Sequence, residues 1–165
     1  MQVLILGNSG SGKSTLAQAL TEQHQLAHLD LDQVAWQTAS PPIRRLLPDS
    51  FTLIDHHTTR HTRWVIEGCY ADLAAHVLQQ RPTLVLLDPP LDTCLRHARQ
   101  RPWEPHKYPN PEEQQANLPM LLDWITEYPG RSDATGRQAH LELFHNYTGT
   151  RHLLASTEHF ALPPD

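Results

Sequence analysis

The chain has 165 residues, of which 39% are hydrophobic and 19% charged, and this is the size and composition of one folded domain. Its 13 Lys and Arg residues against 18 Asp and Glu residues give a formal net charge of −5, which argues against nucleic acid bound through a broad basic surface. No apolar run approaches the roughly 20 residues that cross a bilayer, and the apolar start is too short for a signal peptide. We therefore expect a single domain over residues 1–165, located in the cytoplasm and without a membrane partner.

The N-terminal half of the chain predicts three strands and one helix. The run from Gln2 to Leu6 is almost continuously apolar, as expected of a strand buried in a parallel sheet. Apolar residues recur at helical spacing after the glycines that follow this strand. The polar stretch 58–62 reads as a connection. In chain order, the predicted elements are a strand at 2–6, a helix that includes 16–20, and strands at 28–30 and 64–66.

A fourth strand is predicted at residues 83–88, where two prolines stop it. Apolar residues then recur at i, i+3, i+4 and i+7 from Leu91, which predicts a helix with Arg96 and Arg99 on its other face. Strands that alternate with helices pair in parallel through right-handed crossovers and bind ligands at their carboxyl ends. The pattern therefore predicts an α/β fold.

The last third of the chain begins with an irregular segment. Residues 101–109 contain three prolines and no usable period, which predicts a loop. Asn110 followed by Pro111 is typical of a helix N-cap and the first helical position. Another helix at about 133–147 and a fifth strand at 151–155 complete the predicted elements.

The glycine-rich loop after the first strand reads Gly7-Asn8-Ser9-Gly10-Ser11-Gly12-Lys13-Ser14. It matches the pattern G-x-x-x-x-G-K-[ST] in full, between a strand and a helix as that pattern requires. Glycines let backbone N–H groups turn toward phosphates, and the helix N-terminus adds positive charge. Lys13 is expected to reach the β- and γ-phosphates, and the Ser14 hydroxyl to bind Mg²⁺. The loop thus predicts a site for ATP and Mg²⁺, with Thr15 and Arg96 as further nucleotide-binding candidates.

A carboxylate at a neighbouring strand end is expected to hold Mg²⁺ or its waters. Two residues are candidates, because Glu67 ends the third predicted strand and Asp88 ends the fourth. The glycine that follows Glu67 allows a close approach of backbone to ligand, whereas two prolines follow Asp88 in what looks like a turn. The sequence favours Glu67 and leaves Asp88 open.

Two further acids, Asp30 and Asp32, follow the second predicted strand. Strand alternation would place both carboxylates on the same side. Paired acids there can accept the proton of an acceptor hydroxyl and orient it for in-line attack on the γ-phosphate. Either residue can be the base in this hypothesis, and the alternative is a solvated turn that caps the next helix.

The segment at about 99–115 is predicted to form a lid over the nucleotide. It follows the fourth strand and its helix, so its root lies at the same sheet edge as the glycine-rich loop. Arg99 and Arg101 are expected to place positive charge on the transferring phosphoryl group, and Lys107 adds a third cation. The alternative is a proline-rich surface loop without a role in the reaction.

Taken together, these motifs resemble the adenylate kinase and shikimate kinase group of small P-loop kinases. His28-Leu29-Asp30 with Trp36, and the run Trp64-Val65-Ile66-Glu67-Gly68-Cys69-Tyr70, resemble more closely the adenylate-kinase-like proteins labelled as related to the DNA topology modulator FlaR. The resemblance implies a three-layer P-loop NTPase fold with a five-stranded parallel sheet in the order 2-3-1-4-5. It also implies a nucleotide at the P-loop and a mobile lid after the fourth strand.

This resemblance does not identify the phosphoryl acceptor of the present chain. Asp30 and Asp32 match the acidic pair of shikimate kinases, but no constellation of shikimate-binding arginines and glycines matches. Glu67-Gly68 resembles the Asp-Gly that opens the nucleotide-monophosphate motif of adenylate kinases, and Cys69-Tyr70 replaces the rest of it. The leading hypothesis is an ATP-dependent phosphotransferase, of the nucleoside monophosphate kinase or shikimate kinase type, whose partner is a small nucleotide or hydroxylated metabolite. The alternative is an ATP-dependent switch with slow hydrolysis, and the oligomeric state stays open.

Overall fold

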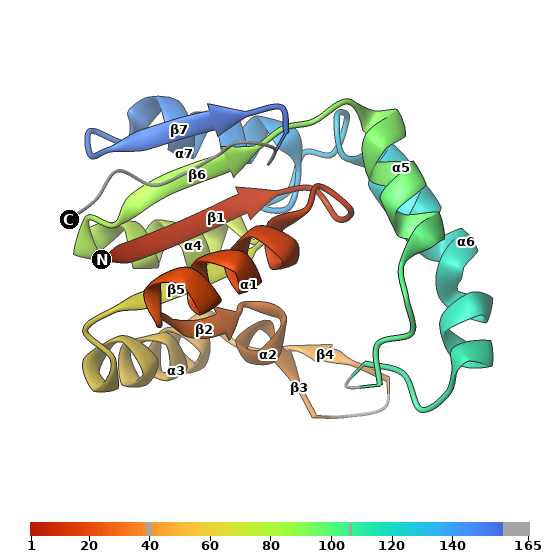
Figure 1. The fold of residues 1–165 in the computed structure, drawn as a ribbon, viewed down its shortest axis with the longest axis horizontal. Coiled ribbons are helices and arrows are strands. Elements are labelled where there is room, and N and C mark those ends of the chain that lie inside the picture. Colours follow the sequence, from red (N-terminus) through yellow and green to blue (C-terminus); the bar gives the residue numbers. More distant parts are fainter. Residues whose placement is uncertain (39–40, 106, 157–165) are drawn as a thin grey trace.

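The computed structural model describes residues 1–38, 41–105 and 107–156, and a five-stranded parallel sheet lies at its centre (Figure 1). In spatial order the strands are β2 (Ala27–Asp30), β5 (Trp64–Gly68), β1 (Gln2–Gly7), β6 (Thr83–Leu87) and β7 (Arg151–Leu154). Counted along the chain within this sheet, the order is 2-3-1-4-5, as predicted, and every neighbouring pair is parallel. The predicted α/β class is confirmed.

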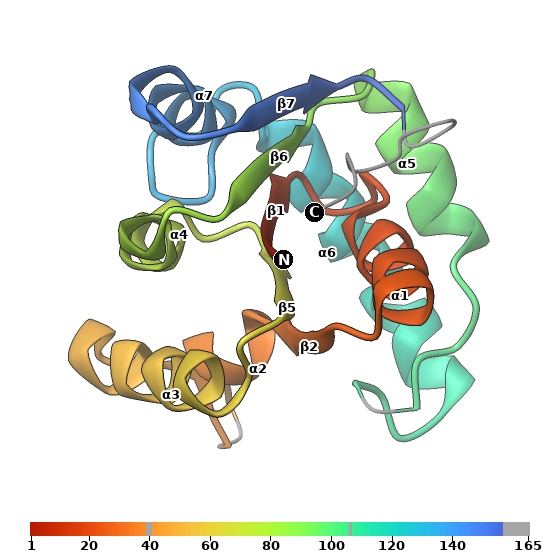
Figure 2. The same cartoon turned by 60° about the vertical axis from the view of Figure 1, so that its left-hand side comes forward.

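Helices cover both faces of the sheet and so make three layers (Figure 2). One face carries α1, and the other carries α3, α4 and α7, while α5 and α6 pack on each other beyond the carboxyl ends of the strands. The helix bounds are α1 (Lys13–His24), α2 (Asp32–Ala35), α3 (Leu47–Arg60), α4 (Ala71–Val77), α5 (Leu91–Gln100), α6 (Pro111–Glu127) and α7 (Arg137–Asn146), with a 3-10 turn η1 (Leu78–Gln80). A small hairpin of β3 (Trp36–Gln37) and β4 (Ile43–Arg44) lies outside the main sheet.

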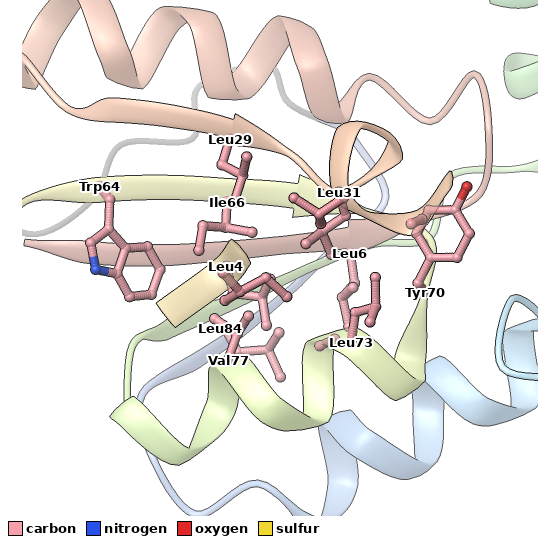
Figure 3. Packing of buried hydrophobic residues seen from close by; sticks show 14 of the residues in the cluster. Leu4, Leu6, Leu29, Leu31, Trp64, Ile66, Tyr70, Leu73, Val77 and Leu84 are labelled. Atoms are coloured by element: carbon pink, nitrogen blue, oxygen red, sulfur yellow. The ribbon is translucent and has the colours of Figure 1, made fainter. Parts of the chain in front are cut away.

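Alternation along β1 builds the core on both faces of the sheet. Val3 and Ile5 pack toward α1, and Leu4 and Leu6 pack toward the opposite face. Figure 3 shows this second cluster, in which side chains of α4 meet those of the strands, with Tyr70 at the end of the cluster. Burying each such side chain stabilises the fold by about 1.5–3 kcal/mol. The strand that leads into the glycine-rich loop is therefore held firmly from both sides.

Several local predictions need correction. Residues 58–60 belong to α3 and are not a connection, and the hairpin at 36–44 was not predicted. The last helix begins at Arg137 and not near Asp133, because the Asp133 carboxylate accepts hydrogen bonds from the Thr135 N–H and hydroxyl and so closes a turn there.

Other local predictions are confirmed. The stretch 101–105 and residues 107–109 form neither helix nor strand. Asn110 caps α6 by accepting a hydrogen bond from the Glu113 N–H at 2.8 Å, and α6 continues through Pro119. Among the described helices, none combines the length and the apolar character that crossing a membrane requires.

Candidate active site

The glycine-rich loop joins the buried end of β1 to the first turn of α1 at the carboxyl edge of the sheet. Gly10 and Gly12 have φ values of +75° and +95°, in the left-handed region that favours glycine. A Cβ atom at Gly10 would lie 2.3 Å from the carbonyl oxygen of Cys94 in α5. The loop therefore needs glycine at this position both for its backbone angles and for the helix that packs against it.

Two side chains tie the loop to the helices beyond the sheet. The Asn8 amide donates a hydrogen bond to the Ile125 carbonyl of α6 at 3.1 Å. Nδ1 of His97 in α5 lies 2.9 Å from the Gly10 carbonyl oxygen and must carry a proton to donate to it. Sequence patterns did not single out His97, which stands three residues after Cys94 on the helix that contacts the loop. Helix α5 thus holds the loop from one side, and it leads directly into the predicted lid.

Lys13, Ser14 and Glu67 meet at the end of β1 and β5. The Lys13 ammonium donates to the Asn8 carbonyl oxygen at 2.8 Å, and the Ser14 hydroxyl donates to Glu67 Oε1, also at 2.8 Å. The register explains this meeting, because Ile5 pairs with Glu67 on the neighbouring strand. The structure thus brings together the two residues predicted to serve magnesium.

Glu67 is 97% buried, since only 3% of it is exposed. Burial alone would raise its pKa, but contacts with His28, Lys13 and Ser14 outweigh burial and hold the pKa below its usual range. Glu67 is therefore a carboxylate at neutral pH and can act as a hard oxygen ligand.

Asp88, the competing candidate for magnesium, has a different partner. Its carboxylate accepts three hydrogen bonds from Arg137 at the start of α7, the shortest at 2.6 Å. This bidentate pair joins the end of β6 to α7. The geometry therefore favours Glu67.

Gly68 was predicted to allow a close approach of the backbone to a ligand, and in the structure it makes room for another side chain. A Cβ atom there would lie 2.7 Å from the Cβ of Leu31, so the side chain of Leu31 fills this space. The Leu31 N–H donates to the Glu67 carbonyl oxygen at 2.8 Å. Glycine at 68 allows this close packing between the end of β5 and the turn after β2.

The acid pair lies at the end of β2, next to Glu67 in the β2–β5 register. Asp30 is the last strand residue and Asp32 begins α2, so a turn, and not strand alternation, brings them together. The Asp32 N–H donates to Asp30 Oδ1 at 2.9 Å. Burial, followed by the charges of Asp32 and Glu67, raises the pKa of Asp30 to about 6.

An aromatic pair borders the acids. The Tyr70 hydroxyl donates to Asp32 Oδ1 at 2.6 Å, and the Trp36 indole N–H donates to the Tyr70 oxygen at 2.8 Å. The hairpin that carries Trp36 is thus fixed against the acid pair. Burial raises the pKa of the neighbouring Cys69 thiol to about 12, so this residue is a poor nucleophile.

The predicted lid already touches the acid pair. Lys107 Nζ lies 3.8 Å from Asp30 Oδ2 and 3.5 Å from Asp32 Oδ2. Arg101 forms an ion pair with Glu104 at 3.2 Å within the same segment. Arg99 is exposed on α5.

The remaining nucleotide-binding candidates lie on helices next to the loop. Thr15 is exposed in the first turn of α1, and Arg96 is exposed on α5. The described contacts of α5 with the loop come from its Cys94 backbone and from His97 instead.

A cavity of about 420 Å³ adjoins the loop at the carboxyl ends of β6 and β7. Asn8, Pro90, Tyr128 and Arg137 are among its lining residues. Over residues 1–38, 41–105 and 107–156, no three His, Cys, Asp or Glu side chains are grouped as a metal site of protein ligands alone would need.

A family model described as an AAA domain matches residues 3–110, which is more than half of the chain. The chain belongs to this AAA domain family. The matched range contains the glycine-rich loop, the acid pair and Glu67, and it ends at the N-cap of α6. Helices α6 and α7 and strand β7 lie beyond it.

One curated relative of this AAA domain protein is the uncharacterized protein YqaC of Bacillus subtilis (strain 168), which is 29% identical over 100 residues. The match covers 61% of this chain and 56% of YqaC, so the chain spans little more than half the length of this relative.

Two solved structures share the fold. An unliganded sugar kinase from Janibacter sp. HTCC2649 superimposes with a TM-score of 0.52 at 14% identity, over 93% of this chain and 83% of that chain. Shikimate kinase from Bacteroides thetaiotaomicron gives 0.51 at 18% identity, over 94% and 86%. The predicted fold of the small P-loop kinases is thus confirmed.

Proposed function

We propose that this protein is an ATP-dependent kinase that transfers the γ-phosphoryl group of ATP to a hydroxyl of a small acceptor. One observation carries the proposal. The hydroxyl of Ser14, the residue that follows Lys13 in the sequence, lies 2.8 Å from the Glu67 carboxylate. The pair Asp30 and Asp32 lies at the end of the adjacent strand. The groups proposed to bind phosphate, to bind the metal and to accept a proton thus lie along one edge of the sheet.

The roles follow from the chemistry of each group. In the proposal the backbone of residues 7–15 surrounds the phosphates, and Lys13 leaves the Asn8 carbonyl to bind the β- and γ-phosphate oxygens. Ser14 and Glu67 would hold Mg²⁺ together with phosphate oxygens and waters, which suits a cation that keeps several waters and takes few protein ligands. The cavity beside Asn8 offers space for the nucleoside.

Transfer breaks the bond between the γ-phosphorus and the β–γ bridging oxygen and forms a bond from that phosphorus to the acceptor oxygen. The acceptor proton passes to a carboxylate of the acid pair and then to solvent, and ADP leaves. Arg99, Arg101 and Arg96 are proposed to approach the phosphates when segment 99–115 closes, where positive charge stabilises the transition state. Asp30 suits the role of base because its pKa of about 6 is nearer to neutral pH than that of an ordinary carboxyl.

A product assay tests the proposal. The protein is incubated with γ-labelled ATP, Mg²⁺ and separate pools of nucleosides, nucleotides and hydroxylated metabolites, and label is followed into new phosphate esters. We expect a labelled ester in at least one pool, with its formation lost in Lys13→Ala. ATP hydrolysis that yields only inorganic phosphate in every pool would instead favour a nucleotide-dependent switch.

A further inference from the structure

The acceptor side of the site carries more carboxylates than free cations. Glu67 has Lys13 beside it, whereas Asp30 and Asp32 share one lid residue, Lys107. Asp32 donates its backbone N–H to the Asp30 carboxylate, and Asp30 pairs with Glu67 in the β2–β5 register, so three carboxylates share this corner. A second anion brought here by an acceptor would meet repulsion.

Arg44 of β4 and the adjacent Arg45 are already bound to other groups. Arg44 donates two hydrogen bonds to the Asp72 carboxylate at 3.2 and 3.1 Å and a third to the Ala35 carbonyl. Arg45 donates to the carbonyl oxygens of Val34 and Trp36 at 3.2 and 3.0 Å. An acceptor with a phosphate or carboxylate group needs a free cation to bind it, and these two guanidinium groups hold the hairpin together instead.

An ammonium group already occupies the space between the two acids. Lys107 Nζ lies 3.5–3.8 Å from one oxygen of each carboxylate and 3.7 Å from Glu104. These separations exceed normal hydrogen-bond lengths, so the lysine makes charge contacts that another cation can replace. Its own carboxylate neighbours hold the pKa of Lys107 above the usual range despite burial.

The wall beside the acids is aromatic and already carries one cation, Arg44, against its rings. Arg44 lies over the Tyr70 ring at 4.5 Å from its centroid, and the indole of Trp36 is 38% exposed. Aromatic faces attract ammonium and guanidinium groups through their negative quadrupole. The Trp36–Tyr70–Asp32 hydrogen bonds fix this wall against the acid pair.

We propose that the acceptor is an amino alcohol or amino sugar, whose protonated amine replaces the Lys107 ammonium between Asp30 and Asp32 while a neighbouring hydroxyl takes the phosphoryl group. This inference rests on the proposed kinase function. In the reaction the amine keeps its proton and charge, and only the hydroxyl proton passes to a carboxylate as the phosphorus–oxygen bond forms. Lys107 then competes with the acceptor and leaves when it binds.

Three probes that share one sugar ring and differ in charge test this idea: glucosamine, glucose and glucuronate. Binding of each to the full chain is measured by calorimetry with Mg²⁺ and the non-hydrolysable ATP analogue AMP-PCP present. We expect glucosamine to bind about five- to tenfold more tightly than glucose, as one added ion pair allows, and glucuronate to bind most weakly. Asp30→Asn should reduce the preference for glucosamine.

The variant Lys107→Met gives a second test, because the inference predicts whether its affinity for each probe rises or falls. If Lys107 competes with the acceptor amine, its removal should tighten glucosamine binding about threefold or more. If Lys107 instead binds an anionic acceptor, its removal should tighten the binding of no probe and should weaken the binding of glucuronate. Arg60→Met on the exposed surface of α3 removes the same charge away from the site and should change neither.

Each outcome separates this inference from the kinase proposal. A flat or reversed order of the three probes, or no binding by any of them while AMP-PCP binds, overturns the amine acceptor and leaves the ATP site intact. Failure of AMP-PCP itself to bind overturns the kinase proposal first. If Asp30→Asn weakens binding of AMP-PCP with Mg²⁺ and leaves the probe order unchanged, the acid pair serves the metal and the inference is wrong.

Discussion

The half of the site proposed to bind phosphate (the phosphate half) and the half proposed to bind the acceptor (the acceptor half) are built in different ways. Lys13, Gly10 and Glu67 are buried: Lys13 donates to the Asn8 carbonyl oxygen, Gly10 lies against α5, and Glu67 lies on β5 beside β1. Asp32 and Lys107, by contrast, have side chains that are 45% and 30% exposed, and they come from α2 and from an irregular segment. The phosphate half is therefore part of the core, while the acceptor half is assembled from partly exposed surface segments.

Substitutions in the acid pair should have the largest effect on the acceptor half. Asp32→Asn removes a charge that faces the acceptor and leaves the P-loop intact, so phosphoryl transfer should fall by about 10²–10⁴-fold while ATP affinity changes little. Transfer by the wild type should also decline as pH falls through about 6, because the Asp30 carboxylate then takes up a proton.

Steady-state kinetics with each acceptor that gives a product, at pH 5 to 8, check both statements. Asp123→Asn on the exposed surface of α6 is the matched control and should leave turnover unchanged. If Asp30→Asn lowers transfer and Asp32→Asn does not, Asp30 alone acts on the acceptor. If neither variant has an effect, the pair is a structural turn.

A substitution in the phosphate half should act on nucleotide binding instead. Gly10→Ala places a Cβ atom 2.3 Å from the Cys94 carbonyl oxygen at a φ of +75°, and such strain costs about 1–3 kcal/mol. ATP affinity should fall by roughly tenfold to a hundredfold because the loop must shift. In Gly130→Ala, the nearest atom to the new Cβ is 3.9 Å away, so this control should bind ATP like the wild type.

The lid arginines should have a smaller effect that separates turnover from binding. Arg99→Ala and Arg101→Ala should each lower turnover by at least about tenfold and change ATP affinity little, because their charge acts on the transferring group. Arg60→Ala on α3 serves as the charge control. Proteolysis should cut segment 99–115 readily without ligands and slowly with ATP analogue and acceptor present. Wild-type turnover in both arginine variants would reduce this segment to an ordinary surface loop.

His140 is a buried histidine that lies outside both halves of the site, so we expect it to affect only the stability of the fold. His140 is fully buried, accepts a hydrogen bond from the Tyr128 hydroxyl at Nδ1 and donates from Nε2 to the Cys69 carbonyl oxygen. Burial lowers its pKa to about 4 from an ordinary 6.5. Between pH 6.5 and 4 the unfolded chain therefore binds a proton at this histidine and the folded protein does not. The free energy of unfolding falls by up to about 3 kcal/mol as a result.

The variant His140→Gln isolates this effect. Its unfolding free energy should fall less steeply than that of the wild type as pH drops from 6.5 to 4. Asp30, whose pKa is raised, acts in the opposite direction, but it is present in both proteins and cancels in the comparison. Equal pH slopes in urea titrations of the two proteins would show that His140 is not held neutral.

The sequence predicted the strand, the loop and the helix of the phosphate half because their signals are local. A continuous apolar strand, a motif of eight residues and a carboxylate at a strand end lie within short segments, and parallel pairing then fixes their positions. The meeting of Ser14 with Glu67 follows from that register. The strand order was predicted through the family resemblance.

The acceptor half was predicted only in part, because it depends on contacts between distant surface segments. The two strands of the hairpin at 36–44 have two residues each, too short for a periodic signal. Helix α3 buries Ser50, whose hydroxyl donates to the Val34 carbonyl, beside Ile54, so a polar residue interrupts its apolar face. Contact of Lys107 with the acids depends on the path of an irregular loop, which residue patterns do not specify.

The central claim is that the glycine-rich loop binds Mg²⁺ and ATP through Lys13, and calorimetric titration of Mg²⁺–ATP into the wild type and Lys13→Ala tests it most directly. The account predicts measurable binding by the wild type and a loss of at least about a hundredfold in the variant, since a charge on the β- and γ-phosphates is removed. Thermal unfolding should show that both proteins are folded. Equal ATP affinities in the two folded proteins would contradict the assignment of this loop as the phosphate site.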